Sequence, residues 1–431
     1  MFTSKPGFLR LKNLTQLASL NVVVAGLSYI LTIALANYLG PQDFGFYSYV
    51  LVLAASFTIF IDYATDISAA SLMAENKSIK KTFRVIYSVR ILIYTILFGL
   101  SWIIFLINFL SFSEKLDLFI GFNALILPAL YTSFLFELRR KNATFLIIYG
   151  IERIIYIIAI ASLILFDFLD IRIIFLIFLI ISISSLFYQL NFNKKYFGNN
   201  FSINLNDAVF VLKKNYLLVI VNISAFFYGG YSRLILEGQY GLETLGIYSA
   251  GLQITNAVTI LQSQIDRVWR LDISIAIKQQ NIKTLKKLIK EYFIFTTIPL
   301  TFAALIIYFS SDFIESYFFS DSYRGLSSIL KILCFFFITL NFDSLSRICW
   351  VALGKFKEYA ILSIVAPVII ILILFLSENT YSIETFATFV VSGQLFASTL
   401  MLFRARSHII SKNQANQGAL NNEKNKKFFK K

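Results

Sequence analysis

Charged side chains inside long apolar stretches are the residues of this sequence that could do chemistry. Glu152 and Arg153 lie around the inner third of one apolar stretch, and Arg90 lies at comparable depth in another. A charge at the centre of a bilayer costs roughly 2.5 kcal/mol or more. Adjacent residues on a helix point in different directions, so Glu152 and Arg153 cannot neutralise each other face to face. We interpret Arg90 and Arg153 as candidate substrate ligands and Glu152 as a candidate ion-coupling group. The alternative is a structural ion pair, for example Arg90 with Asp62.

Asp62 and Asp66 form a second charged group, four residues apart in the apolar stretch 45–70. On one continuous helix this spacing places both carboxylates on the same face, where like charges repel. We therefore expect a cation, a proton or an arginine to join them, and we interpret Asp62 as a candidate ion-coupling residue. The alternative is a solvated pair at the membrane surface, which fits Asp66 better than Asp62.

Two helices carry stripes of polar or small residues in equivalent register. These are Asn21, Ala25, Ser28 and Thr32 on the first helix, and Asn222, Phe226, Gly229 and Arg233 on the seventh. A polar stripe on a helix in lipid must face protein or water. Helix packing explains the small residues, whereas Arg233 either binds a ligand or extends to the outer surface. We predict Asn21, Asn222 and Arg233 as further substrate ligands. Asp266 and Arg267 are expected to close the eighth helix at the cytoplasmic boundary.

The composition requires that these residues sit in a membrane protein. Of 431 residues, 58% are hydrophobic and 15% charged, and the mean hydropathy is +0.73. Soluble domains have about 25% charged residues, and a helix needs about 20 apolar residues to cross a bilayer. Apolar stretches of this kind predict twelve transmembrane helices, at 14–36, 45–70, 84–110, 117–136, 144–166, 172–190, 215–236, 244–268, 291–310, 326–351, 359–376 and 383–403.

The distribution of lysine and arginine gives the orientation of these helices. With the twelve spans, thirty of these cations fall on one side, and only Lys115, Arg172 and Arg324 fall on the other. This bias predicts a cytoplasmic location for the basic side and for both termini. The net charge of +15 is therefore a consequence of topology and does not indicate nucleic-acid binding. The basic tail after residue 403 could contact anionic membrane lipids.

Residues for catalysis, metal binding or cofactor binding are scarce. His408, the single histidine, lies in the polar tail, and Cys334 and Cys349 share one apolar segment. We therefore predict no metal site and no catalytic triad. No glycine-rich nucleotide motif lies in a suitable context, so we predict no cofactor and no enzyme activity. The outer loops are too short for a membrane glycan polymerase, which would need large outer loops with catalytic groups.

An internal repeat relates the two halves of the chain. Residues 39–48, LGPQDFGFYS, align with residues 240–249, YGLETLGIYS, at a constant offset of 201 residues. The alignment pairs Gly40 with Gly241 and extends without a gap to Asn21 and Asn222. Glycine at the first pair allows a tight turn between antiparallel helices.

A repeat of six helices enters the membrane in the same direction each time, because six is even. We therefore predict an all-α membrane protein with two six-helix bundles related by a pseudo-twofold axis along the membrane normal. The predicted boundaries are 1–190 for the N-terminal bundle, 191–214 for a cytoplasmic linker, 215–403 for the C-terminal bundle and 404–431 for the basic tail. Two parallel bundles around a cleft are typical of alternating-access carriers.

The two turn elements and the twelve spans with basic inner loops resemble the Wzx-type polysaccharide flippases. These form the polysaccharide transporter branch of the multidrug/oligosaccharidyl-lipid/polysaccharide exporter superfamily, and the resemblance covers residues 1–405. It implies that the chain moves an undecaprenyl-diphosphate-linked oligosaccharide, an O-antigen or capsule repeat unit, across the bacterial inner membrane. It also implies V-shaped bundles and a central cavity lined by helices one, two, seven and eight. Acidic groups such as Asp62 and Glu152 could couple the movement to a proton or sodium gradient, and polysaccharide assembly proteins are possible partners.

A drug or cation antiporter of the same superfamily is the main alternative. An arginine-rich cavity suits a diphosphate, because the planar guanidinium matches phosphate oxygens. An acidic cavity suits cationic drugs instead. The charges of this chain are mixed, which favours the flippase only slightly.

Overall fold

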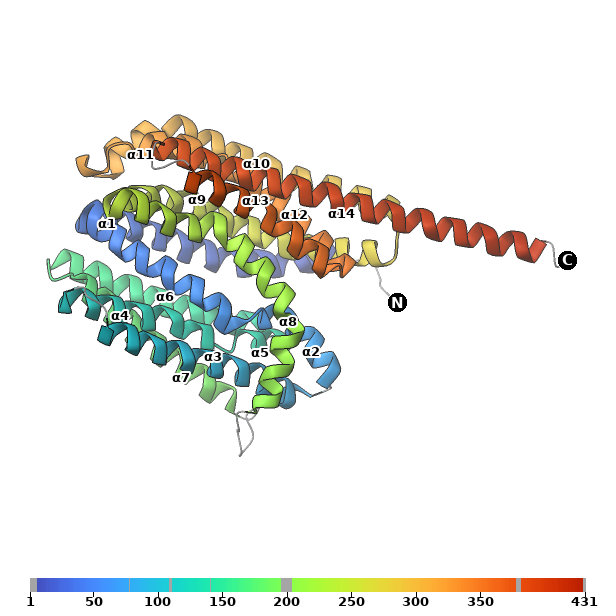
Figure 1. Ribbon diagram of the computed structural model, residues 1–431, viewed down its shortest axis with the longest axis horizontal. Coiled ribbons are helices and arrows are strands. Elements are labelled where there is room, and N and C mark those ends of the chain that lie inside the picture. The colour runs from blue at the N-terminus through green and yellow to red at the C-terminus, as the bar shows by residue number, and fades with distance from the viewer. Residues whose placement is uncertain are drawn as a thin grey trace. The chain divides into compact units, whose positions relative to one another are not determined.

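The chain is helical throughout the residues that the structure describes. In the computed structural model these are residues 6–76, 78–107, 111–139, 141–194, 204–376 and 381–428 (Figure 1). The helices are α1 Pro6–Asp62, α2 Thr65–Asn76, α3 Ile79–Ile107, α4 Phe112–Ile126, α5 Ser133–Leu138, α6 Asn142–Leu165, α7 Ile171–Phe192, α8 Leu205–Phe226, α9 Ser232–Lys278, α10 Ile282–Phe318, α11 Leu326–Leu333, α12 Phe336–Leu353, α13 Phe356–Leu376 and α14 Ile383–Phe428. Short turns lie at η1 Leu127–Leu130, η3 Phe227–Tyr231 and η4 Asp321–Tyr323. The predicted all-α class is confirmed.

Ten helical stretches among the described residues are long and apolar enough to cross a membrane. Two of them, Gly26–Ala69 with 44 residues and Leu205–Thr255 with 51 residues, are more than twice the length of about 20 residues that one crossing needs. Each is interrupted by a glycine outside helical geometry, Gly40 in α1 and Gly241 in α9. When each of these two stretches is counted as two spans, the ten stretches give the predicted twelve spans.

The glycines of the internal repeat make a symmetric contact. Gly40 has φ 73° and ψ 170°, and its repeat partner Gly241 has φ 83° and ψ 178°, a backbone conformation that essentially only glycine adopts. The next repeat pair, Gly45 and Gly246, packs backbone against backbone. A Cβ on Gly45 would lie 1.9 Å from the carbonyl oxygen of Leu242, and one on Gly246 would lie 1.9 Å from that of Pro41. Since Pro41 and Leu242 are themselves one repeat apart, the two turn elements pack through equivalent atoms.

Two spans break in the middle, at positions that matter for the site. The second span ends as α1 at Asp62, and Tyr63 and Ala64 have positive φ values of 48° and 54° before α2 begins. The sequence had predicted Asp62 and Asp66 on one continuous helix. This prediction is wrong, because the helix breaks between them. The fourth span consists of α4, the 3₁₀ turn η1, which contains Pro128, and α5. Proline removes a backbone donor and disrupts the helical hydrogen bonds around it.

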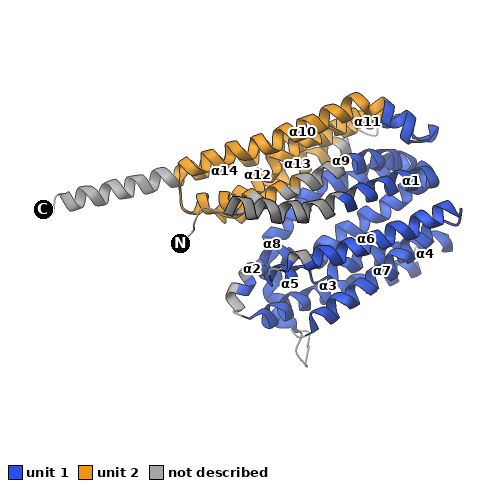
Figure 2. Ribbon diagram, turned by 180° about the vertical axis from the view of Figure 1, so that it is seen from behind, with its two compact units in different colours: residues 1–254, 313–326 blue, residues 255–312, 327–431 orange. Residues whose placement is uncertain are grey.

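The chain divides into two compact units, shown in Figure 2. Unit 1 comprises residues 1–254 and 313–326, and unit 2 comprises residues 255–312 and 327–431. In unit 1, α4 packs on α7, α3 on α8 and α1 on α6. Buried side chains such as Phe83, Phe134 and Val89 form its core. The predicted bundles 1–190 and 215–403 stay a prediction from the sequence repeat.

Unit 2 is held together by packing and by buried polar contacts. In this unit α12 and α13 pack on α14. The indole of Trp350 is fully buried, stacks on Tyr359 and donates to the carbonyl of Met401 at 3.0 Å. Asn341 accepts from Thr296 at 2.7 Å and donates to Thr297 at 2.6 Å. The two cysteines are unpaired and buried.

Candidate functional site

Arg90 is the most deeply buried charge among the described residues and organises the centre of unit 1. It lies on α3, is 2% exposed, and its guanidinium lies over the ring of Phe134, 5.0 Å from the centroid. An arginine has five N–H donors, and all five are used. The partners are Oγ1 of Thr65 at 2.9 Å, the carbonyls of Ala129 and Tyr131 at 3.1 and 3.0 Å, the carboxylate of Asp66 at 2.7 Å, and the carboxylate of Asp62.

These contacts explain why a charge is tolerated at this depth. Interrupted helices leave backbone groups without intrahelical partners, and such groups must find partners in protein when no water is present. Arg90 supplies donors to two carbonyls at the break in the fourth span. At the same break, the N–H of Thr132 donates to Oε1 of Gln189 on α7 at 3.0 Å. The arginine that was predicted to join Asp62 and Asp66 is therefore Arg90, and its contacts are those of a structural ion pair.

A polar cavity of about 560 Å³ opens beside this cluster. Its wall includes Arg90, Thr58, Asp62, Asp66, Ser133, Asn222 and Phe226, which come from five helices of unit 1. The side chains of Asp62 and Asp66 are 25% and 47% exposed, so carboxylate oxygens face the cavity. Within the part of the chain that the structure describes, the amide of Asn222 makes no hydrogen bond. Two carboxylates and one guanidinium give the wall a formal charge of −1.

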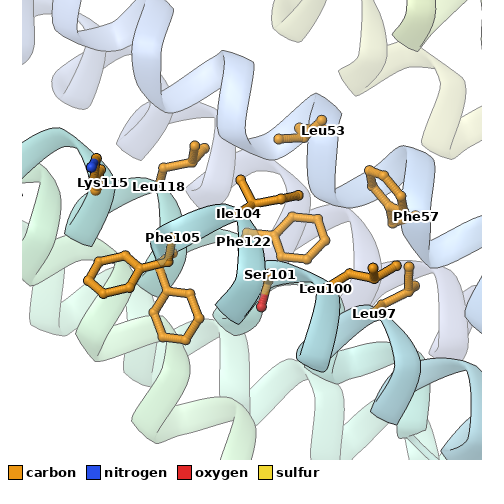
Figure 3. Close-up of a pocket in the computed structure, with 11 residues that line it drawn as sticks. Leu53, Phe57, Leu97, Leu100, Ser101, Ile104, Phe105, Lys115, Leu118 and Phe122 are labelled. Atoms are coloured by element: carbon orange, nitrogen blue, oxygen red, sulfur yellow. The ribbon is translucent and has the colours of Figure 1, made fainter. Parts of the chain in front are cut away.

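A second cavity of unit 1 lacks groups of this kind. It has a volume of about 240 Å³ and is lined by side chains of α1, α3 and α4 that are apolar except for Ser101 and Lys115. Figure 3 shows Phe57, Phe105 and Phe122 around it, with Lys115 at one end. Ligand sites combine apolar walls with a few convergent polar groups that fix the ligand's orientation. Only the cavity at Arg90 has such groups among the two described here, so we take it as the candidate site.

Glu152 does not line this cavity but is connected to it through Tyr131. Its carboxylate is 6% exposed and accepts from the hydroxyl of Tyr131 at 2.9 Å and from that of Ser185 at 2.8 Å. The carbonyl of Tyr131 also accepts a hydrogen bond from Arg90. A chain of hydrogen bonds thus links the two charged positions, and the carboxylate has neutral hydrogen-bond partners.

Arg153 lies elsewhere on α6, as expected from its position next to Glu152. It donates from Nε to the hydroxyl of Tyr149 at 2.9 Å. Its guanidinium also lies near two aromatic rings, 5.0 Å from the centroid of Tyr149 and 5.7 Å from that of Phe178. This arrangement leaves Arg153 half-buried and outside the cavity wall.

The stripe residues are separated in the structure. Asn222 is in the cavity wall, whereas Arg233 lies just after the π-helical turn η3 and donates from Nε to the carbonyl of Gly229 at 2.7 Å. The side chain of Asn21 lies outside the described residues. Of the predicted site residues, Asp62, Arg90 and Asn222 are therefore brought together, and Glu152, Arg153 and Arg233 are not in the same wall.

A comparison with protein families shows the family to which the chain belongs. The model of the polysaccharide biosynthesis protein family matches residues 10–269, more than half of the 431 residues. The chain belongs to this family. The match covers the second, third, fourth and seventh spans, and hence every residue of the cavity wall. No curated protein sequence gives a significant match.

Solved structures show the fold of this polysaccharide biosynthesis protein. A transporter of the multidrug/oligosaccharidyl-lipid/polysaccharide exporter superfamily from Pyrococcus furiosus has a TM-score of 0.63 at 12% identity, over 95% of this chain and 99% of that one. A multidrug resistance transporter of the same superfamily in an inward-facing conformation has a TM-score of 0.58 at 12% identity, over 95% and 99%. A further structure in complex with the ligand MaL6 has a TM-score of 0.61 at 13% identity, over 94% and 96%. The fold is that of these membrane transporters, and the predicted family resemblance is confirmed.

Several residues of the candidate site were not predicted from the sequence. Tyr131, Ser133 and Gln189 were not singled out, although they satisfy or surround the break in the fourth span. Pro128 in the middle of a predicted span was the available indication of that break. A proline there disrupts helical hydrogen bonds, so nearby carbonyls need donors from another span, and Arg90 supplies two.

Proposed function

We propose that the protein is a flippase for a lipid-linked oligosaccharide and moves it across the bacterial inner membrane by alternating access. Membership of the polysaccharide biosynthesis family is the observation that carries this proposal. The superfamily fold provides the membrane framework, and the polar cavity provides a place for a hydrophilic group at the depth of the interrupted helices. Both termini are placed in the cytoplasm on the basis of the distribution of lysine and arginine.

The cavity is suited to sugar hydroxyl groups. Carboxylate oxygens of Asp62 and Asp66 accept hydrogen bonds from hydroxyls, and the free amide of Asn222 can both donate and accept. Phe226 adds an apolar ring against which a sugar face can pack. A volume of about 560 Å³ lies within the range of roughly 300–1,000 Å³ that is common for ligand sites, and it has room for part of an oligosaccharide.

The diphosphate is assigned to a different position from the sugar. Arg90, which the sequence had suggested as a phosphate ligand, uses all five of its N–H donors within the protein. The wall also has a net negative charge, which repels phosphate. Arg233 uses its Nε for Gly229, and its terminal nitrogens have no hydrogen-bond partner among the described residues. We therefore assign the phosphate to Arg233, and keep Arg153 as the second candidate.

One observation favours a second function, the efflux of cationic compounds. The negative formal charge of the cavity wall attracts cations, and it is the reverse of what a diphosphate needs. The similar structures include a multidrug resistance transporter, but at 12% identity this likeness shows the fold alone. The family match therefore supports the flippase more strongly than the charge supports a drug antiporter.

Asn222→Ala tests the flippase without disturbing the framework, because the amide makes no hydrogen bond to the described part of the protein. In a host strain that lacks the gene, the variant should restore surface polysaccharide about fivefold less well than the unsubstituted chain, as expected for the loss of one hydrogen bond to substrate. Asn206→Ala, an exposed asparagine on the same helix α8, is the matched control and should restore export fully.

The same strains separate the two functions. Deletion of a flippase gene should leave lipid-linked glycan on the cytoplasmic side of the membrane and leave the susceptibility to cationic dyes unchanged. If deletion leaves surface polysaccharide intact and increases dye accumulation, the flippase proposal is wrong and the antiporter is correct.

A further inference from the structure

The apolar cavity of unit 1 has a lysine at one end and no role in the function proposed above. It has a volume of about 240 Å³ and lies between α1, α3 and α4, which pack on one another. Lys115 lies at one end of it (Figure 3). Toward the other end, Phe57 and Phe122 meet edge to face, with ring centroids 5.3 Å apart. The cavity is therefore apolar at one end and carries a positive charge at the other.

The cavity is elongated along the helices. Its lining runs from Lys115 to Phe122 on α4 and from Leu97 to Phe105 on α3. At the helical rise per residue, each of these stretches is roughly 10–12 Å long. Lys115 and Phe105 lie beside the connection between α3 and α4, and Leu97 and Phe122 lie deeper in the spans. Since half of a bilayer has a hydrocarbon thickness of about 15 Å, the cavity has the length and direction of part of a lipid chain.

Water is a poor occupant of this cavity. A buried water needs two to four polar partners, and Ser101 and Lys115 are the polar members of the lining. The hydroxyl of Ser101 is already engaged, because it donates to the carbonyl of Phe98 at 2.7 Å and accepts from Nδ2 of Asn123 at 3.2 Å. An engineered apolar cavity of about 150 Å³ in another protein stays dry and binds a hydrocarbon. The lining therefore favours an apolar occupant.

The cavity is reached from the exposed apolar face of α3. Leu100 and Ile104 line the cavity and are 46% and 56% exposed. Trp102 and Ile103 beside them are 45% and 52% exposed. All four residues belong to the candidate span Ile79–Ile107, and a broad apolar face on a membrane span is suited to contact with lipid chains. A chain from the bilayer can therefore enter the cavity without crossing a polar layer.

The charge of Lys115 is not compensated by a carboxylate among the residues that the structure describes. Asp117 accepts from Arg172 at 2.6 Å. Glu114 accepts from the N–H and the hydroxyl of Ser111 at 3.1 and 2.7 Å, and its charge lies at the N-terminus of α4, where the helix dipole favours it. The ammonium of Lys115 is thus complementary to the phosphate of a lipid head group.

We propose that this cavity binds one acyl chain of an anionic phospholipid such as phosphatidylglycerol, with the phosphate at Lys115. Inside a bilayer, filling the cavity gains the dispersion contacts that an empty cavity lacks, and the lysine adds the preference for negative charge. A zwitterionic phospholipid carries its own ammonium group and gains less from Lys115. The orientation that the lysine and arginine distribution predicts puts this lipid in the outer leaflet. The site is separate from the cavity at Arg90 and does not depend on the flippase proposal.

Photo-cross-linking of the full-length protein in lipid nanodiscs tests the charge preference. The nanodiscs consist of phosphatidylcholine with a small fraction of phosphatidylglycerol that carries a diazirine in one acyl chain. After illumination, mass spectrometry should find the label on lining residues of α3 and α4, and added phosphatidylglycerol should displace it. Lys115→Gln should lower this label about fivefold, because one cation near the head group is lost. Lys81→Gln removes an exposed lysine of α3 outside the lining and should leave the label unchanged.

A second pair of variants tests the cavity itself. Ile104→Trp places a large ring in the cavity and should remove most of the label from α4. Ile103→Trp is the matched control, because Ile103 is similarly exposed on the same helix but does not line the cavity. If Ile104→Trp does not fold, Ile104→Phe replaces it and should lower the label in the same direction.

Four results would overturn the proposal. Two of them are an unchanged label in Lys115→Gln and an unchanged label in the variants at Ile104. The third is equal labelling of the lining by phosphatidylcholine that carries the same diazirine. The fourth is displacement of the label by undecaprenyl phosphate but not by phosphatidylglycerol, because the occupant is then a polyprenyl chain. None of these measurements requires glycan transport, so failure of the flippase proposal is measured separately.

Discussion

Replacement of Gly246 by alanine should destabilise the protein far more than the same change at a glycine with free space. A Cβ at Gly246 would lie 1.9 Å from the carbonyl oxygen and 2.8 Å from the carbonyl carbon of Pro41. Real Cβ atoms essentially never approach closer than 3.0 Å, so the two backbones must separate by at least 1.1 Å at the closer contact. Both partners are backbone, and no side-chain rotation relieves the overlap.

The magnitude follows from two opposing terms. Forced overpacking in a well-packed region costs typically about 1–3 kcal/mol. Alanine is favoured over glycine in a helix by up to about 1 kcal/mol, and this gain applies at any helical glycine. Gly238, also on α9, has no atom within 4 Å of its ideal Cβ. Gly238→Ala should therefore be neutral or slightly stabilising, and Gly246→Ala should be about 2 kcal/mol less stable than Gly238→Ala.

The assay is thermal unfolding of each purified variant in the same detergent, followed by far-ultraviolet circular dichroism. Gly246→Ala is expected to unfold at a temperature several degrees below Gly238→Ala. Gly45→Ala should behave like Gly246→Ala, because its Cβ would lie 1.9 Å from the carbonyl oxygen of Leu242. If the variants at Gly246 and Gly238 unfold together, the two turn elements are not in backbone contact.

Two other substitutions test the framework. Arg90→Ala should lower the free energy of unfolding by about 3–5 kcal/mol, because it leaves two carboxylates and two carbonyls without their donor. Arg84→Ala breaks a half-exposed pair with Asp207 and should lower it by at most about 1 kcal/mol. Equal urea midpoints for the two variants would contradict the structural role of Arg90. Gly241→Ala should lower the free energy of unfolding by about 1–3 kcal/mol, because alanine is strained at φ 83° and ψ 178°. A melting temperature identical to that of Gly238→Ala would show that the backbone conformation at Gly241 is different.

The sequence was sufficient for the fold but not for the partners of its charges. Apolar stretches and the lysine and arginine distribution predict twelve spans, and Gly40 and Gly241 predict the turns that the structure has. The pair of Asp62 and Arg90, which was the alternative interpretation of these charges, is present. The helix break at Tyr63 and Ala64 was not predictable, because neither residue favours positive φ. That conformation is held by tertiary contacts, such as the hydrogen bond of Asn215 to the carbonyl of Tyr63 at 3.1 Å.

Depth in the membrane also does not give the hydrogen-bond partners of each charge. Arg90 and Asp266 show the difference: the sequence ranked Arg90 among the best substrate ligands and placed Asp266 at the surface. In the structure Arg90 uses every donor to hold interrupted helices, and Asp266 is buried and accepts from three neutral donors. Sequence position gives the depth of a charge but not the number of its hydrogen-bond partners.

The hydrogen-bond partners of each charge distinguish residues that hold the framework from residues with unused hydrogen-bonding groups. Arg90, whose donors are all satisfied by the protein, has none left for a ligand, so we assign it to the framework. Glu152 is different, because its carboxylate is held by the neutral hydroxyls of Tyr131 and Ser185. Arg233 and Asn222 retain unused hydrogen-bonding groups and can interact with a substrate that arrives and leaves. In the proposed function, framework and recognition therefore belong to different residues, and unused hydrogen-bonding capacity distinguishes them.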